Sequence, residues 1–156
     1  MIVSDSSPLI FLSKINSLFL LEKTYKKIII PEEVKEEIFF KNEQENHIIK
    51  NLISKNLIEQ RKIEKPLSLN IGRGETAAIS LALELKLPLL IDEAPGTKIA
   101  KSLGIKTIRT TLLIFSSPNK KIINKNEAID LINKLIEKGY YISPRHYALI
   151  ISKLKE

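Results

Sequence analysis

The sequence predicts an α/β fold of three α/β/α layers, built on a mostly parallel central sheet of about five strands. Short β-branched runs alternate with longer helical patterns, which is typical of a parallel sheet covered by helices on both faces. The chain has 156 residues, so we expect a single domain over residues 1–156. Hydrophobic residues make up 44% of the chain and charged residues 28%, as in ordinary globular proteins.

The expected strands are short runs rich in Ile, Leu and Val. The first opens with Ile2-Val3, the second is stopped by Pro31, and the third is the weakest of the set. The five strands are expected at residues 2–5, 27–30, 57–63, 87–91 and 106–108. Because the carboxyl ends of parallel strands meet at one edge of a sheet, and ligands bind at that edge, the functional residues should gather there.

Helical periodicity fills the segments between these strands. Pro31 suits the first position of the second helix, and Gly72-Arg73-Gly74 forms a turn into the third. The helices are expected at residues 8–23, 31–55, 74–86, 95–103, 126–138 and 144–155.

The composition excludes several kinds of protein. The chain has no cysteine, which excludes disulfides, zinc–thiolate sites, iron–sulfur clusters and thiol nucleophiles, and indicates a reducing compartment. The longest stretch without a charged residue, Thr110–Asn119, is much shorter than the roughly 20 apolar residues of a membrane-spanning helix. Asp5, Pro8 and Lys14 interrupt the apolar run that a signal peptide would need. We therefore expect a cytoplasmic protein that makes no contact with a membrane.

The net charge of +7 is concentrated in the second part of the chain. Residues 1–93 hold 13 Lys and Arg against 14 Asp and Glu, whereas residues 94–156 hold 12 against 4. Such an excess is typical of proteins that bind a polyanion, because phosphate contacts dominate nucleic-acid affinity. A lysine-rich composition with solvated side chains explains the same numbers equally well.

Two aspartates follow predicted strands directly, Asp5 after Ile2-Val3-Ser4 and Asp92 after Leu89-Leu90-Ile91, and Glu93 stands beside the second. A carboxylate at the end of a buried strand is costly to desolvate and needs a partner. Each aspartate could instead cap the helix that follows it. Since capping alone does not require both, the pair favours a shared site.

Two glutamates are added by helical geometry. Glu37 lies at the edge of the apolar stripe that Val34 and Ile38 form. Glu75 heads the apolar face of the helix that begins near residue 74, where stabilisation by the helix dipole is the alternative explanation.

Four or five carboxylates at one edge of the sheet would repel one another, and a divalent cation relieves that repulsion. Oxygen-only ligand sets suit Mg²⁺ or Mn²⁺, which activate water and stabilise a phosphodiester under attack. An acidic site in a partly basic protein therefore predicts a metal-dependent nuclease. Arg109, Lys120 and Lys121 are candidates to hold the phosphates, unless the lysines beside Pro118 belong to a solvated loop.

In order and spacing, the motifs of the chain resemble those of the PIN-domain ribonucleases, in the DUF3368 branch of bacterial and archaeal PIN proteins. The resemblance covers nearly the whole sequence. It rests on Val3-Ser4-Asp5-Ser6-Ser7-Pro8-Leu9-Ile10, Ile29-Ile30-Pro31-Glu32-Glu33-Val34 with Glu37, Gly72-Arg73-Gly74-Glu75-Thr76-Ala77-Ala78-Ile79, Leu90-Ile91-Asp92-Glu93 with Ala100 and Leu103-Gly104-Ile105, and Gly139-Tyr140-Tyr141-Ile142-Ser143-Pro144 with Tyr147.

The resemblance implies a PIN-like α/β/α fold and metal-dependent endoribonuclease activity, in many cases as the toxin of a toxin–antitoxin pair and as a homodimer. By matching motif, Asp5, Glu37 and Glu75 are the first three acids of the catalytic site, and Asp92 or Glu93 is the fourth. Asp5, Glu75 and this fourth acid are the implied ligands of Mg²⁺ or Mn²⁺. Ser7 matches a small polar residue that orients the first acid or a water, and Lys98 matches a basic residue of the substrate side.

The sequence departs from the family pattern after the fourth strand. Glu93 stands where the branch has a second aspartate, and Ala94 and Thr97 replace its usual arginines. These departures leave open a non-catalytic PIN-like module that binds RNA or protein. A phospho-acceptor receiver domain also gathers acids at strand ends, but the lysine after its last strand is not evident here.

Overall fold

The computed structural model describes residues 1–40 and 46–156, and it confirms the α/β prediction. The described strands form one sheet in the order β3-β2-β1-β4-β5, and each neighbouring pair is parallel. The first strand is therefore central. The strands are β1 (Ile2–Ser4), β2 (Ile28–Ile30), β3 (Ile58–Gln60), β4 (Leu89–Leu90) and β5 (Thr107–Ile108).

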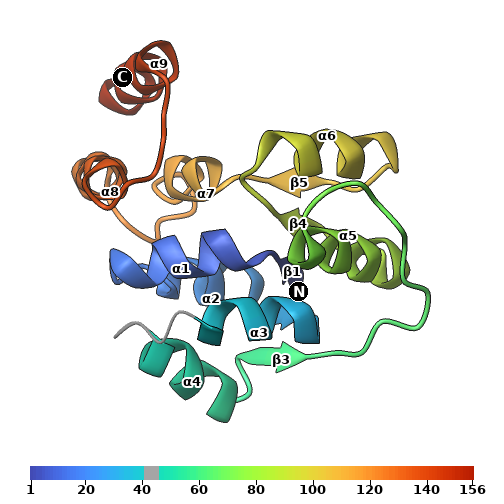
Figure 1. Ribbon diagram of the computed structural model, residues 1–156. Coiled ribbons are helices and arrows are strands. Elements are labelled where there is room, and N and C mark those ends of the chain that lie inside the picture. Colours follow the sequence, from blue (N-terminus) through green and yellow to red (C-terminus); the bar gives the residue numbers. More distant parts are fainter. Residues whose placement is uncertain (41–45) are drawn as a thin grey trace.

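Helices cover the sheet on both faces, as the three-layer prediction requires. Figure 1 shows α1, α2 and α7 on one side of the sheet and α5 and α6 on the other, with α8 and α9 outside α7. The helices are α1 (Ser6–Lys14), α2 (Phe19–Tyr25), α3 (Glu32–Phe40), α4 (Asn46–Ser54), α5 (Arg73–Leu85), α6 (Ala94–Ser102), α7 (Thr110–Ser116), α8 (Lys125–Glu137) and α9 (Pro144–Lys155). No helix in the described ranges has both the length and the apolar composition needed to cross a bilayer.

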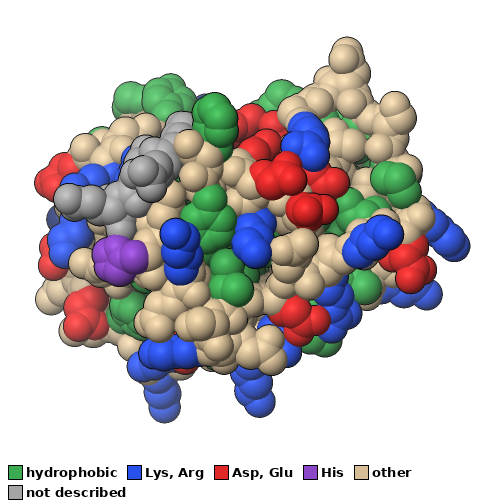
Figure 2. Space-filling model, turned by 60° about the horizontal axis from the view of Figure 1, so that its bottom comes forward, with side chains coloured by type: hydrophobic (Ala, Val, Ile, Leu, Met, Phe, Trp, Pro, Cys, Tyr) green, Lys and Arg blue, Asp and Glu red, His purple; other side chains and the backbone are tan. Residues whose placement is uncertain are grey.

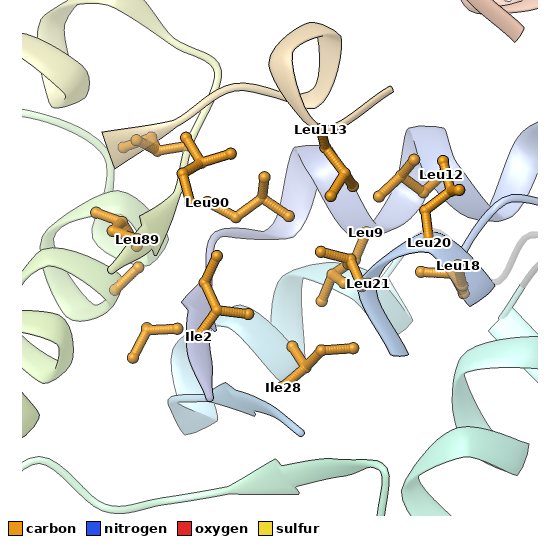
Figure 3. Packing of buried hydrophobic residues seen from close by; sticks show 14 of the residues in the cluster. Ile2, Leu9, Leu12, Leu18, Leu20, Leu21, Ile28, Leu89, Leu90 and Leu113 are labelled. Carbon is orange, nitrogen blue, oxygen red and sulfur yellow. The ribbon is translucent and has the colours of Figure 1, made fainter. Parts of the chain in front are cut away.

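The core lies between the sheet and the helices on either face. The side chains of β1, β2 and β4 are buried, which explains why all of them except Ser4 are apolar, without polar alternation. Figure 3 shows leucines of α1, α2 and α7 packed over Ile2, Ile28 and Leu90 of the strands. This packing holds the ends of the central strands, and so the residues that follow them, in fixed positions.

One helix prediction needs correction, a second falls partly on residues that are not described, and one helix was not predicted. The helix expected at 8–23 is divided into α1 and α2, because the chain turns at Asn16, whose φ of 53° is outside the helical region. The helix expected at 31–55 is α3 and α4, and the part of the prediction on residues 41–45 lies outside the described residues. Helix α7 was not predicted, since Thr110 and Thr111 are β-branched and have weak helix propensity.

The carboxyl ends of β1 and β4 lie side by side. Ser4 is in register with Leu90, and the Asp5 amide donates to the Leu90 carbonyl at 3.0 Å. Asp5 then leads into α1, and Glu93 is the residue before α6. The amino terminus of α5 joins this edge, because α5 packs on both β1 and β4 and also against α3.

Candidate active site

A cleft of about 340 Å³ opens at this edge of the sheet, and four carboxylates line it. Two of them belong to α3 and α5, and the other two directly follow β1 and directly precede α6, as expected from their positions in the sequence. These four residues are Asp5, Glu37, Glu75 and Glu93, and the remaining lining residues are Ser6, Ser7, Ile10, Phe40 and Gly72.

Asp5 is the most buried of these acids, with 2% of its surface exposed. It occupies the N-cap position of α1, yet its side chain makes no cap hydrogen bond, so capping does not account for it. Its Oδ1 is buried and has no hydrogen-bond partner among the described residues. Burial raises the pKa of Asp5 to about 7; a hydrogen bond from the Ser6 backbone opposes the shift, and the nearby charges of Glu37, Glu93 and Asp92 add to it.

Glu75 lies in the first turn of α5 and is only partly buried, but its Oε2 is shielded from solvent and has no hydrogen-bond partner in the described part of the chain. Desolvation raises its pKa to about 7, and hydrogen bonding to Glu93 and the charges of Glu93, Asp5 and Glu37 add to the shift. The glycine at 96 makes room for this carboxylate, because a Cβ there would lie 2.5 Å from Oε2.

Glu37 is held by two donors from other elements. The Ser6 hydroxyl donates to its Oε2 at 2.6 Å, and the Gly74 amide, in the first turn of α5, donates to its Oε1 at 3.0 Å. A side chain at position 74 would displace the Glu37 carboxylate, so the glycine there lets Glu37 keep this position. Sequence reasoning missed Ser6, because no local pattern links it to a residue 31 positions away.

Glu93 and Asp92 are adjacent in the sequence but differ in their surroundings. Glu93 is exposed, lines the cleft and, like Asp5, makes no cap hydrogen bond although it is the N-cap of its helix. Asp92 is buried and is not part of the cleft lining. Of the two alternatives for the fourth acid, the structure brings Glu93 to the cleft.

The Asp92 carboxylate is fully hydrogen-bonded. Its Oδ1 accepts from the Thr110 amide at 2.8 Å and from the Tyr140 hydroxyl at 2.8 Å, and its Oδ2 accepts from the Thr110 hydroxyl at 2.6 Å. Asp92 therefore satisfies the first turn of α7, a helix 18 residues later, and not the helix that follows it. Sequence reasoning missed Thr110 and Tyr140 as partners, since only the folded chain brings them together.

Tyr140 completes this buried group of residues. Desolvation, followed by the charge of Asp92, raises the pKa of the Tyr140 hydroxyl well above its usual range, so the hydroxyl remains a hydrogen-bond donor. Its ring packs edge-on against Phe11 of α1, with 5.2 Å between the centroids. These contacts anchor the segment before α9 to the core.

The predicted substrate residues are not all near the cleft. Ser7 lines it, whereas the lining includes no Lys or Arg. Lys98 is exposed on α6, and Arg109 donates to the Asp92 carbonyl at 3.1 Å. The Nζ of Lys120 lies 5.8 Å from the centroid of the Tyr25 ring, and Tyr25 stands just before the amino end of β2. Lys121 follows Lys120 in the same turn. The lining of the cleft therefore contains none of the basic residues that were predicted to hold phosphates, and their contact with a substrate stays a prediction.

Acidic side chains dominate the surface near α3. Figure 2 shows the face that α3, α4 and β3 contribute to, where acidic side chains gather in one region and basic side chains are spread over the rest. Arg73, at the start of α5, forms an ion pair of 2.7 Å with Glu36 on α3. An exposed pair of this kind adds little stability.

The chemistry of the cleft fits a divalent cation. Two of its carboxylates have a buried oxygen without a donor among the described residues, and both have raised pKa values, so negative charge at this edge lacks compensation. As the side chains stand, however, no three His, Cys, Asp or Glu residues of the described chain form a group that could hold a metal ion. Glu93 is exposed and Glu75 partly so, which leaves both free to adjust around a cation.

The chain is similar to known PIN proteins in sequence and in fold. Among solved structures it resembles a PilT N-terminus domain protein from the hyperthermophilic archaeon Sulfolobus solfataricus, with a TM-score of 0.58 and 23% sequence identity over 75% of this chain and 93% of that one. No curated protein matches it. The family model DUF3368, described as a PIN domain, matches residues 1–156. The chain thus belongs to the DUF3368 family of PIN domains, a fold whose members are generally nucleases.

Proposed function

We propose that the protein is a metal-dependent endoribonuclease that uses Mg²⁺ or Mn²⁺ at the cleft. The observation that carries the proposal is the convergence of Asp5, Glu37, Glu75 and Glu93, with buried oxygens of Asp5 and Glu75 that have no donor in the described part of the chain. Membership of the PIN family supports this assignment.

Asp5, Glu75 and Glu93 would hold the cation, and Asp5 would be the central ligand because it ends the central strand, where the backbone is most firmly held. When bound, a divalent ion makes a nucleophile of water at neutral pH and stabilises the charge of a phosphodiester under attack. Asp92 was also predicted as a ligand. We assign it a positioning role instead, because three donors already occupy its carboxylate.

Glu37 and Ser6 shape the site. The hydrogen bonds from Ser6 and Gly74 fix the Glu37 carboxylate beside Asp5, where its charge raises the pKa of Asp5. Ser7, on the cleft wall, would orient a water or a phosphate oxygen. Glu37 would therefore add negative charge where a cation must bind, and Ser6 would hold Glu37 in that position.

The rim of the cleft offers an aromatic surface for a base. Phe40, the last residue of α3, lines the cleft and is 87% exposed, with Ile10 on the same wall. Unpaired bases stack on exposed aromatic rings with little dependence on sequence. The cleft therefore favours single-stranded RNA, whose bases are available for stacking.

The deciding experiment is cleavage of end-labelled, unstructured RNA in Mg²⁺ or Mn²⁺, with wild type compared with Asp5→Asn. We expect cleavage by wild type, none in EDTA and none by Asp5→Asn, while the exposed control Asp130→Asn cuts normally. If wild type cuts no RNA with either metal, the alternative of a non-catalytic PIN-like module, which Glu93 and the missing arginines favour, replaces the proposal.

The family resemblance adds two further proposals about partners. One is an antitoxin protein, which would make this nuclease a toxin, and the other is a homodimer. Light scattering measures the mass of the purified chain and tests the second directly. Co-expression with the product of the adjacent gene, followed by cleavage assays, tests whether a partner protein inhibits the nuclease.

A further inference from the structure

A second cavity, of about 360 Å³, lies at the open edge of β5 between α6, α7 and α9. Aliphatic and aromatic side chains of α7 and α9 form much of its lining, among them Leu112, Phe115, Leu149 and Ile150. Leu112 is 49% exposed and Leu149 is 55% exposed. We call this cavity the α7–α9 groove.

One wall of the groove is a single face of α9. The α9 residues that face it are His146, Leu149, Ile150 and Lys153, spaced as one face of a helix. From His146 to Lys153 this face extends over roughly 10 Å, which is long enough for about two turns of a docked helix or a few extended residues. Exposed apolar side chains gathered in this way mark a site of interaction.

The charges around the groove have one sign. Lys101, Arg109 and Lys153 line it, and no Asp or Glu is among its described lining residues. In the described part of the chain neither Lys101 nor Lys153 forms an ion pair. An occupant with acidic residues beside apolar ones would neutralise these cations and cover the leucines at the same time.

The exposed leucines favour protein over RNA as that occupant. Phe115, His146 and Arg109 of the lining can each stack on a base, but leucine side chains offer a base neither a stacking plane nor a hydrogen bond. Exposed leucines on two neighbouring helices offer the kind of apolar contact that anchors an amphipathic segment.

We infer that the α7–α9 groove docks an acidic, amphipathic segment of a partner protein, with its apolar side chains between Leu112 and Leu149 and its carboxylates on Lys101, Arg109 and Lys153. This inference does not depend on the proposed nuclease function, because the groove lining shares no residue with the acidic cleft.

A selection experiment tests the inference without knowledge of the partner. Short random peptides displayed on phage are selected on the wild-type chain and counter-selected on the double variant Leu112→Glu/Leu149→Glu. Both leucines are exposed, so the variant should fold, and circular dichroism checks that it does. We expect the retained peptides to combine Asp or Glu with Leu, Ile or Phe.

A synthetic peptide of the selected sequence is then titrated into each variant by calorimetry. Leu149→Glu should weaken binding by roughly tenfold or more, as loss of a central apolar contact does, and Lys153→Glu should weaken it in a salt-dependent way. Ile136→Glu on α8, 42% exposed and outside the groove, is the matched control and should bind as wild type does.

Three results would overturn the inference. The first is that the selection yields no peptides, or peptides that bind the double variant equally well. The second is that a uridine oligonucleotide displaces the peptide and loses affinity in Lys101→Glu, which would assign the groove to RNA. The third is that the wild-type chain is a dimer by light scattering and Leu149→Glu makes it a monomer, which would assign the groove to a second copy.

Discussion

Asp5 and Asp92 follow neighbouring strands of the same sheet, yet the fold gives them opposite surroundings. Asp5 faces the cleft, where its Oδ1 has no donor among the described residues and its pKa rises to about 7. Asp92, at the end of β4, faces away and accepts three hydrogen bonds from Thr110 and Tyr140.

A position at the end of a strand determines where a carboxylate lies in the fold, but not its role. The role depends on which hydrogen-bond donors reach the carboxylate. Where the donors come from later elements, as for Asp92, the carboxylate becomes a structural junction between β4, α7 and the segment before α9. Where none reaches the oxygen, as for Asp5, the carboxylate remains available to a cation.

The largest expected effect is on the pH dependence of stability in the absence of metal. The folded pKa of Asp5, about 7, lies above its ordinary value of 3.8, so between about pH 4 and 7 the folded state binds more protons than the unfolded state. The free energy of unfolding should therefore fall as pH rises through this window, by about 4 kcal/mol from Asp5, and stay level above it.

Urea unfolding in EDTA at several pH values measures this effect. Asp5→Asn should make the curve shallower, because only the raised pKa of Glu75 then remains in this window, and should make the protein more stable than wild type at pH 8. Asp130→Asn, an exposed control, should follow wild type. A wild-type stability that rises between pH 5 and 7 would show that the Asp5 carboxylate is compensated in solution.

Removal of the Asp92 carboxylate should destabilise the protein, whereas removal of the Asp5 charge should stabilise it. Asp92→Ala leaves the Thr110 amide, the Thr110 hydroxyl and the Tyr140 hydroxyl without their acceptor in a buried region, which should lower the free energy of unfolding by about 3 kcal/mol. Chemical denaturation measures it, with Asp130→Ala as the exposed control. Equal stabilities of the two variants would disprove the role of Asp92 as a junction.

Substitution of Asp5 should weaken the binding of Mn²⁺, whereas substitution of Asp92 should leave it nearly unchanged. Asp5→Asn should lose roughly 100-fold in affinity, or about 3 kcal/mol, because it removes the proposed central ligand. Asp92→Asn should bind Mn²⁺ nearly as wild type does, since an amide can still accept from the Thr110 amide and donate to its hydroxyl. Calorimetric titration decides, and equal losses in both variants would make Asp92 a ligand after all.

Binding of RNA should depend on the acidic cleft that Asp5 faces. Phe40→Ala removes the exposed ring at the rim and should weaken binding of a single-stranded oligonucleotide by about 2 kcal/mol, while Phe40→Trp should preserve it. Leu112→Ala, at an apolar residue that is 49% exposed and lies outside the cleft lining, is the control. Fluorescence anisotropy in Ca²⁺, which limits cleavage, measures both, and an unchanged affinity in Phe40→Ala would exclude stacking there.

The smallest expected effect is that of Tyr140→Phe. It removes one of the three donors to Asp92 and keeps the ring contact with Phe11, so the free energy of unfolding should fall by about 1 kcal/mol. Thermal unfolding of this variant beside Tyr141→Phe, whose residue is 80% exposed, provides the measurement. If the two variants lose the same amount, the hydrogen bond to Asp92 adds no net stability.

Much of the fold was predictable because it depends on local sequence. The apolar runs at Ile28–Ile30 and Leu89–Leu90 are strands as expected, and Pro31 precedes a helix. Helix α7 was not predictable in the same way, because its first turn is satisfied by Asp92, 18 residues earlier in the chain. The break at Asn16 was missed because a left-handed residue inside an apolar periodic segment leaves the periodicity intact.

For the candidate site, strand ends and helix faces follow from apolar periodicity, so the sequence was enough to predict which carboxylates lie at the edge of the sheet. Three features became visible only in the folded chain: Glu93 and not Asp92 lines the cleft, Ser6 and Gly74 hold Glu37, and, among the described residues, three basic ones line the α7–α9 groove and none lines the cleft. Hydrogen bonds and burial join residues that are distant in the chain, and no local pattern encodes which donor reaches which oxygen.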